Sequence, residues 1–119
     1  MQTSTIFDPQ KKCIITKFTG ALSDEIVRQC AVEIQKISAE HVNKRLLLDI
    51  REAKIQYSLL DYYRLPKKLY TYGIAKGWKR AVLVPKNLGK DIFETEYVAR
   101  GLKVQICSDE KRAEKWLGR

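Results

Sequence analysis

Apolar and polar positions along the chain alternate between a spacing of two and a spacing of three to four, which predicts strands and helices in succession. Residues 3–8 and 13–18 are short apolar and β-branched runs typical of strands. Asp8, Pro9 and Gln10 lie between them and suit a turn, because proline presets one backbone angle and aspartate bonds its own backbone. The first two strands are therefore predicted to form a hairpin.

A helix is predicted after Thr19 and Gly20, with Ser23 as its N-cap and its end near His41. Its apolar residues recur at helical spacing and are expected to face the core; they are Ile26, Val27, Cys30, Ile34 and Ile37.

Residues 45–50 are a mainly apolar run that ends in charge, as in a central strand buried on both faces. Ser58 is then predicted to cap a second helix, which Pro66 interrupts because proline lacks the amide donor that a helix interior needs.

Residues 81–84 and 104–107 predict two further strands, the second nearer the edge of the sheet because its polar and apolar residues alternate. A third helix is predicted between them and ends at Gly101, and a short final helix begins at Ser108 or Asp109. The inward residues of these two helices are predicted to be Ile92, Phe93 and Tyr97, and Ala113, Trp116 and Leu117.

The predicted order of elements is β-β-α-β-α-β-α-β-α, within a single domain of residues 1–119. Alternating strands and helices form parallel sheets with right-handed crossovers, and the leading hairpin makes the sheet mixed. The predicted fold class is α/β, with a mixed, mostly parallel sheet of about five strands and about four helices.

Basic residues outnumber acidic ones, with 23 Lys and Arg against 14 Asp and Glu and a formal net charge of +9. This excess favours an acidic partner such as a protein surface, a phosphorylated ligand or nucleic acid. The basic residues come in short pairs such as Lys44-Arg45 and Lys79-Arg80, and no run is long enough for a nucleic-acid-binding tail.

Catalytic and metal-binding patterns are missing from the sequence. The cysteines (Cys13, Cys30 and Cys107) lie far apart in apolar surroundings, and His41 is the single histidine. No nucleophile elbow, phosphate-binding loop or dinucleotide-binding glycine pattern occurs. We therefore expect no enzyme activity, no catalytic residues, no metal and no cofactor.

The longest apolar run is three leucines, far short of the ~20 residues of a bilayer span. The first residues also lack the apolar core of a signal peptide, so we expect a cytoplasmic protein with no membrane span.

Four segments, taken in order, resemble the STAS-like domains related to the bacterial anti-sigma-factor antagonist, specifically the small stand-alone SpoIIAA-like group. They are Phe18-Thr19-Gly20-Ala21-Leu22-Ser23, Leu46-Leu47-Leu48-Asp49-Ile50-Arg51, Arg80-Ala81-Val82-Leu83-Val84, and Val104-Gln105-Ile106-Cys107-Ser108-Asp109. The resemblance covers nearly the whole chain. It implies a non-catalytic regulatory or protein-interaction module with a protein partner, and a homodimer stays open.

In signalling members of that family, a serine after the central strand is phosphorylated, and Ser58 falls at the corresponding position. The flanking motif differs, because Tyr57 stands where the family has an acid. A phosphate or an external anion at a helix N-terminus would be stabilised by free amides, with Arg51 and Lys54 in the preceding loop as neighbours. The equivalent loop after the next strand carries Lys86, Asn87 and Lys90.

Aromatic residues gather around the second predicted helix, where they favour an apolar groove or simply cover the core. The candidates for the groove are Tyr57, Tyr62, Tyr63 and Tyr70, with Tyr72 and Trp78 nearby. Two alternatives to the protein-interaction module therefore remain, namely a binder of anionic ligands or nucleic acid through a basic surface, and a carrier of a small apolar ligand.

Ser58 provides a direct test of these roles. If it is a helix cap, Ser58→Ala should lower the free energy of unfolding by roughly 0.5–2 kcal/mol, and Ser58→Asp should preserve it. If it is a phosphorylation switch, Ser58→Asp should selectively lose a partner in a pull-down that Ser58→Ala retains. Thermal melts and pull-downs of both variants distinguish the two outcomes, and equal recovery of the partner would contradict the switch.

Overall fold

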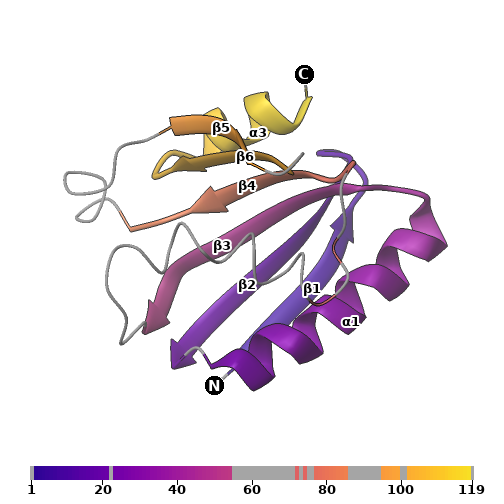
Figure 1. Ribbon diagram of the computed structural model, residues 1–119, viewed down its shortest axis with the longest axis vertical. Helices are drawn as coiled ribbons and strands as arrows, with labels where there is room; N and C mark the ends of the chain where they lie inside the picture. Colours follow the sequence, from indigo (N-terminus) through magenta and orange to yellow (C-terminus); the bar gives the residue numbers. More distant parts are fainter. Residues whose placement is uncertain are drawn as a thin grey trace.

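The computed structural model describes residues 2–21, 23–54, 72, 74, 77–85, 95–99 and 102–118 (Figure 1). Within these ranges, six strands form one sheet in the order β1-β2-β3-β4-β6-β5. The strands are β1 (Gln2–Asp8), β2 (Cys13–Ala21), β3 (Arg45–Lys54), β4 (Lys79–Leu83), β5 (Thr95–Ala99) and β6 (Leu102–Cys107), and the described helices are α1 (Asp24–His41) and α3 (Glu110–Gly118).

The inner strands β2, β3, β4 and β6 run parallel to one another, whereas β1 and β5 pair antiparallel to their neighbours at the two edges. The predicted fold class, an α/β domain with a mixed and mostly parallel sheet, is therefore confirmed. The predicted hairpin of the first two strands and the central place of residues 46–50 are confirmed as well.

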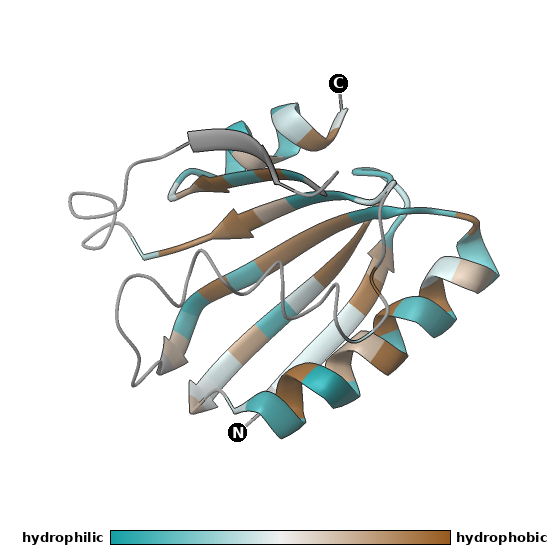
Figure 2. Ribbon diagram, viewed as in Figure 1, coloured by the Kyte–Doolittle hydropathy of each residue, from teal (hydrophilic) through white to brown (hydrophobic). Residues whose placement is uncertain are grey.

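Each face of the sheet is covered by one described helix, α1 on one side and α3 on the other (Figure 1). Strand β3 supplies both cores: Leu46, Leu48 and Ile50 lie in the core beneath α1, and Leu47 lies in the core beneath α3. Figure 2 shows the hydrophobic residues concentrated along β3 and β4, while α1 alternates between hydrophobic and hydrophilic residues. This two-sided burial agrees with the apolar run in the sequence.

Helix α1 begins as predicted, because the Ser23 Oγ accepts a hydrogen bond from the Ile26 amide at 3.3 Å. Its buried apolar residues include Val27, Cys30 and Ile34, in agreement with the helical spacing. His41 in the last turn is exposed and stacks on the Phe7 ring with the centroids 4.1 Å apart.

The region before β6 corrects the prediction. Residues 95–99 form strand β5 rather than the end of a helix, and they pair antiparallel with β6. β6 is therefore enclosed by a neighbour on each side and is not at the edge. A helical spacing of apolar residues can be overridden by cross-strand pairing, which depends on residues outside the local window.

The cap of the final helix, predicted as Ser108 or Asp109, is Asp109. Its Oδ1 accepts a hydrogen bond from the Lys111 amide at 3.0 Å, as the side chain of an N-cap does.

The second predicted helix, from Ser58 past Pro66, and residues 86–94 of the third lie outside the described residues. Neither of the two helices in the described part of the chain is long and apolar enough to cross a membrane.

Helix α1 ends at Val42, whose φ of 49° and ψ of 53° lie in the left-handed region. Its amide still bonds the Ser38 carbonyl, but a β-branched residue is strained in this conformation. The Val42 side chain is 92% exposed, so it contributes no buried area that would offset the strain.

Replacing Val42 with glycine should raise the free energy of unfolding by about 1 kcal/mol, because glycine adopts this conformation without strain and only part of the gain is lost to its greater unfolded-state entropy. Val32→Gly is the matched control: Val32 is an exposed valine inside α1, and its replacement should lower stability by about 0.5 kcal/mol. Urea unfolding measures both, and a loss of stability in Val42→Gly would show that the valine is not strained.

Candidate functional site

The predicted anion site lies where β3 ends, and the structure describes only part of it. Strand β3 extends to Lys54, so Arg51 and Lys54 belong to the strand rather than to a loop after it. The other predicted residues lie outside the described ranges; they are Ser58, Lys86, Asn87, Lys90, Tyr57, Tyr62, Tyr63 and Tyr70.

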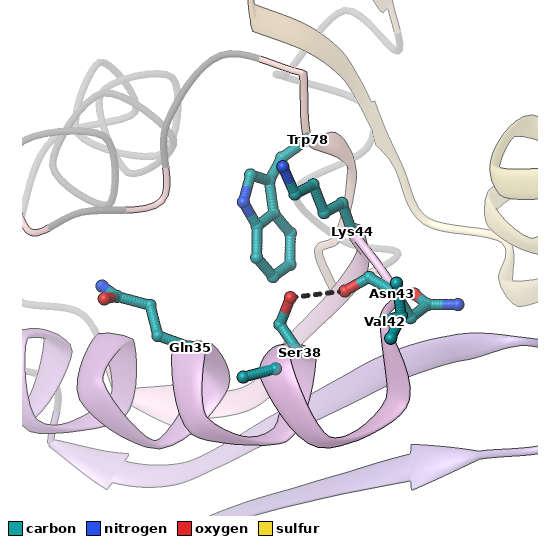
Figure 3. Close-up of a pocket in the computed structure, with 7 residues that line it drawn as sticks. Gln35, Ser38, Val42, Asn43, Lys44 and Trp78 are labelled. Atoms are coloured by element: carbon teal, nitrogen blue, oxygen red, sulfur yellow. Dashed lines mark hydrogen bonds between the residues drawn. The ribbon is translucent and has the colours of Figure 1, made fainter.

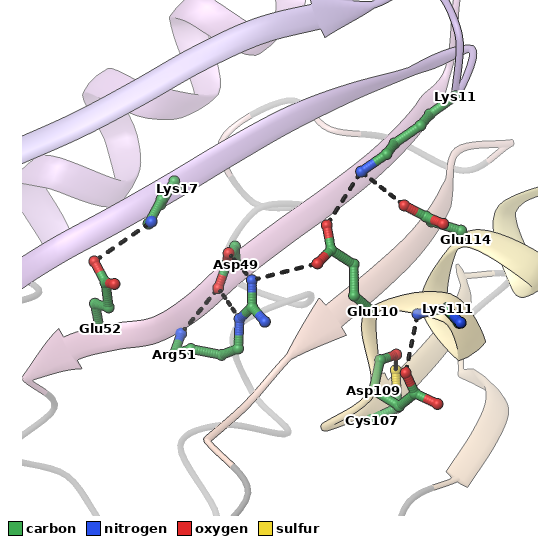
Figure 4. A network of polar contacts seen from close by, with 10 residues as sticks. All are labelled: Lys11, Lys17, Asp49, Arg51, Glu52, Cys107, Asp109, Glu110, Lys111 and Glu114. Carbon is green, nitrogen blue, oxygen red and sulfur yellow. Dashed lines mark hydrogen bonds and ion pairs between the residues drawn. The ribbon is translucent and has the colours of Figure 1, made fainter.

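Arg51 is already engaged by carboxylates. Its Nε and Nη2 donate to the two carboxylate oxygens of Asp49 at 2.9 and 2.8 Å, and its Nη2 lies 3.8 Å from Glu110 Oε2 (Figure 4). Such a two-pronged pair is among the stronger polar contacts in proteins. An external anion at Arg51 would have to compete with both carboxylates, so Arg51 is better explained as a structural residue.

Asp49 depends on this contact because its side chain is only 8% exposed. Burial alone would raise the pKa of Asp49, but hydrogen bonds from the Arg51 side chain and amide, with the Arg51 charge, outweigh burial and lower that pKa below its usual value. Asp49 is therefore ionised at neutral pH.

Further ion pairs lie on the same face: those of Lys11 link the β1–β2 turn to α3, and that of Lys17 links β2 to β3. Lys11 Nζ lies 3.1 Å from Glu110 and 2.7 Å from Glu114, and Lys17 lies 3.4 Å from Glu52 (Figure 4). Hydrogen bonds to Glu114 and then to Glu110 raise the pKa of Lys11. Because these side chains are partly exposed, each pair contributes little to stability. The two pairs of Lys11 mainly set where α3 sits on the sheet.

Basic residues also lie at the opposite end of the sheet, where the parallel strands begin. Arg45, Lys79 and Lys103 are register partners on the adjacent strands β3, β4 and β6, so their side chains project from the same face. We call these three residues the basic row. Lys79 Nζ lies 4.4 Å from the centroid of the Trp116 ring.

A hollow of about 350 Å³ adjoins the basic row. Its lining residues are Val42, Asn43, Lys44, Arg45, Gly77, Lys79 and Lys103. Among the described residues, no carboxylate lies within 4.0 Å of the Lys44, Arg45 or Lys103 side-chain nitrogens, in contrast to Arg51 and Lys11. Lys44, Arg45 and Lys103 are thus cations of the lining to which an anion from outside could bind.

The basic row was not predicted from the sequence, although a signal for it exists. Lys44-Arg45, Lys79-Arg80 and Lys103 each come directly before the apolar part of a strand. Since parallel strands all begin at the same edge of a sheet, aligning the starts of the predicted strands would have brought these cations together.

The described residues offer little for catalysis. All three cysteines are free thiols and buried, as predicted. Burial raises the pKa of Cys13 to about 11 and also raises that of Cys30, so both thiols are protonated at neutral pH and are poor nucleophiles. Within the described ranges, no three His, Cys, Asp or Glu side chains gather in a way that could hold a metal ion.

Comparison with known proteins supports the fold and no more. No family model and no curated protein matches the chain. A crystal structure of an uncharacterised DUF3478-family protein with a SpoIIAA-like fold, from Shewanella loihica PV-4, does match, with 16% sequence identity and a TM-score of 0.52. The match covers 98% of this chain and 92% of that one. The chain therefore has a SpoIIAA-like fold, as the resemblance in sequence predicted.

The contact between Asp49 and Arg51 predicts a pH-dependent stability. The folded-state pKa of Asp49 is lowered, so its contribution is present above the unfolded pKa and is lost as the pH falls through the folded pKa. Arg51→Gln should therefore lower the free energy of unfolding at pH 7 by about 1–2 kcal/mol, a moderate loss because Arg51 is partly exposed and screened.

This deficit of Arg51→Gln should shrink as the pH falls from the ordinary aspartate pKa of about 3.9 towards the lower pKa that Asp49 has in the folded wild type. Urea unfolding at several pH values measures it. Lys17→Gln, which removes an exposed pair, is the control and should change stability little at any pH. A deficit of the same size at pH 2.5 and pH 7 would contradict the role assigned to Asp49.

Proposed function

Since the chain has a SpoIIAA-like fold, we propose that it is a non-catalytic protein-interaction module whose basic row binds an acidic surface of a partner protein. The observation that carries this proposal is the alignment of Arg45, Lys79 and Lys103 across three neighbouring strands. The absence of an activated nucleophile or a metal cluster among the described residues supports a binding role rather than a catalytic one.

The geometry of the basic row favours an anionic partner. Neighbouring strands lie about 4.8 Å apart, so the three basic side chains leave the sheet within about 10 Å of one another. Like charges directly opposite on adjacent strands repel each other and destabilise the sheet. An acidic partner would relieve this repulsion on binding, whereas a neutral or basic partner would not, so the row contributes to selectivity as well as to affinity.

A protein partner is favoured over nucleic acid by the extent of the basic row. Three cations can neutralise only about three phosphates, far fewer than the 6–10 contacts behind the steep salt dependence of typical DNA-binding proteins. A cluster of a few carboxylates on a protein surface matches the row more closely. The net charge of +9 adds long-range attraction to either kind of partner.

The test compares two variants that carry the same change in net charge. Arg45→Glu combined with Lys103→Glu reverses the basic row, and Lys36→Glu combined with Lys111→Glu reverses two exposed lysines on the helices. Each protein is immobilised, and an acidic protein recovered from nuclease-treated native lysate is quantified by mass spectrometry.

The wild type and the control should recover the same acidic partner, and reversal of the basic row should reduce its recovery at least about tenfold, the size expected when charged contacts are replaced by repulsion. Recovery from the wild type should also fall as salt rises, because exposed charges are screened. Equal recovery by both variants, or loss of the partner after nuclease treatment, would contradict the proposal.

A further inference from the structure

A second and larger hollow lies beside the last turns of α1, between that helix and Trp78 (Figure 3). Its volume is about 600 Å³, within the range of 300–1,000 Å³ typical of small-molecule sites. The residues that line it are Gln35, Ser38, Ala39, Val42, Asn43, Lys44 and Trp78.

Two polar residues of the wall are already engaged. The Ser38 hydroxyl donates to the Asn43 carbonyl at 2.7 Å, which fixes the turn that leaves α1. The Gln35 Nε2 donates to the Tyr72 carbonyl at 2.8 Å. These contacts hold the wall in place and leave other donors to receive a ligand.

Two donors remain directed at the hollow. The Lys44 ammonium lies beside the Trp78 indole, and the indole nitrogen faces the space between Trp78 and Gln35 (Figure 3). Trp78 as a residue is only 5% exposed, so its ring is held firmly while its N–H is directed at the hollow. An indole N–H in this position can donate to an acceptor that enters the hollow.

The remaining lining is apolar, with a buried ring as one wall and exposed side chains at the rim. The Trp78 ring forms one wall, and Ala39 and Val42 lie at the rim. Val42 is the strained residue that ends α1, and backbone strain of this kind is concentrated at binding sites. The left-handed conformation of the exposed Val42 lowers the stability of the fold. A contact between Val42 and a ligand would give this residue a role in binding.

We propose that this hollow binds a small organic anion, with its apolar body against Trp78 and Val42 and its carboxylate between the Lys44 ammonium and the Trp78 N–H. A carboxylate accepts both hydrogen bonds at once, and the one to Lys44 is charge-assisted. The site goes beyond the proposed function: Lys44 borders both hollows, but this site depends on Trp78 and not on Arg45, Lys79 or Lys103, so either proposal can fail without the other.

The test uses decanoate as the probe and decanol as its uncharged counterpart. In a Trp116→Phe background Trp78 is the sole indole, so its fluorescence reports the hollow directly. Decanoate below its micelle concentration should change the Trp78 emission saturably, and decanol should bind about tenfold more weakly because it lacks the charge. Isothermal titration calorimetry on the otherwise unaltered chain gives a second readout that does not depend on the Trp116→Phe change.

Variants locate the site. Lys44→Gln should weaken decanoate binding about tenfold, and Trp78→Phe, measured by calorimetry, should also weaken it because the N–H is removed while a ring remains. Lys36→Gln removes a lysine of α1 that does not line the hollow, and this variant should bind decanoate as the wild type does. Absence of saturable binding, equal binding of decanol, or an equal loss in Lys36→Gln would overturn the proposal.

Discussion

Burial of β3 on both faces is the constraint on which the rest of the structure depends. Leu46 and Leu48 are buried beneath α1, and Leu47 is buried beneath α3. Loss of either helix would therefore expose one side of the central strand. A strand covered from both sides pairs most readily with parallel neighbours, whose connections cross over the faces. The parallel arrangement of β2, β3, β4 and β6 then aligns the beginnings of the strands along one edge and their ends along the other.

Basic residues at the two ends of the parallel strands have different surroundings, and this difference underlies the proposed binding role of the basic row. Toward the end of β3, Arg51 meets Asp49 and Glu110, so charge is neutralised within the fold. At the beginning of the strands, Arg45 and Lys103 have no such described carboxylate, and the sheet presents uncompensated positive charge.

The fold could be predicted largely from the sequence because its decisive signals are local. The apolar run at residues 46–50, the Ser23 cap and the spacing along α1 depend on a few neighbouring residues, and each was confirmed. Strand β5 was missed because residues 95–99 are held by pairing with β6, which a helical window does not register. The candidate site was harder for the same reason: Glu110 reaches Arg51 from across the fold, and the basic row exists only once three strands are in register.

The order of the strands also has a consequence for how the chain can vary in length. Strands β1, β2 and β3 are neighbours both in sequence and in the sheet. The pairing of β3 with β4 has to enclose the connection of residues 55–78. The entropy of closing a loop grows only logarithmically, by about 0.6 kcal/mol for each doubling of its length. The closure entropy alone therefore changes only slightly with the length of this connection, whereas Ile74 and Trp78, which are buried in the core beneath α1, constrain its end. A connection that is lengthened before Ile74 can consequently leave the alignment of Arg45 with Lys79 the same.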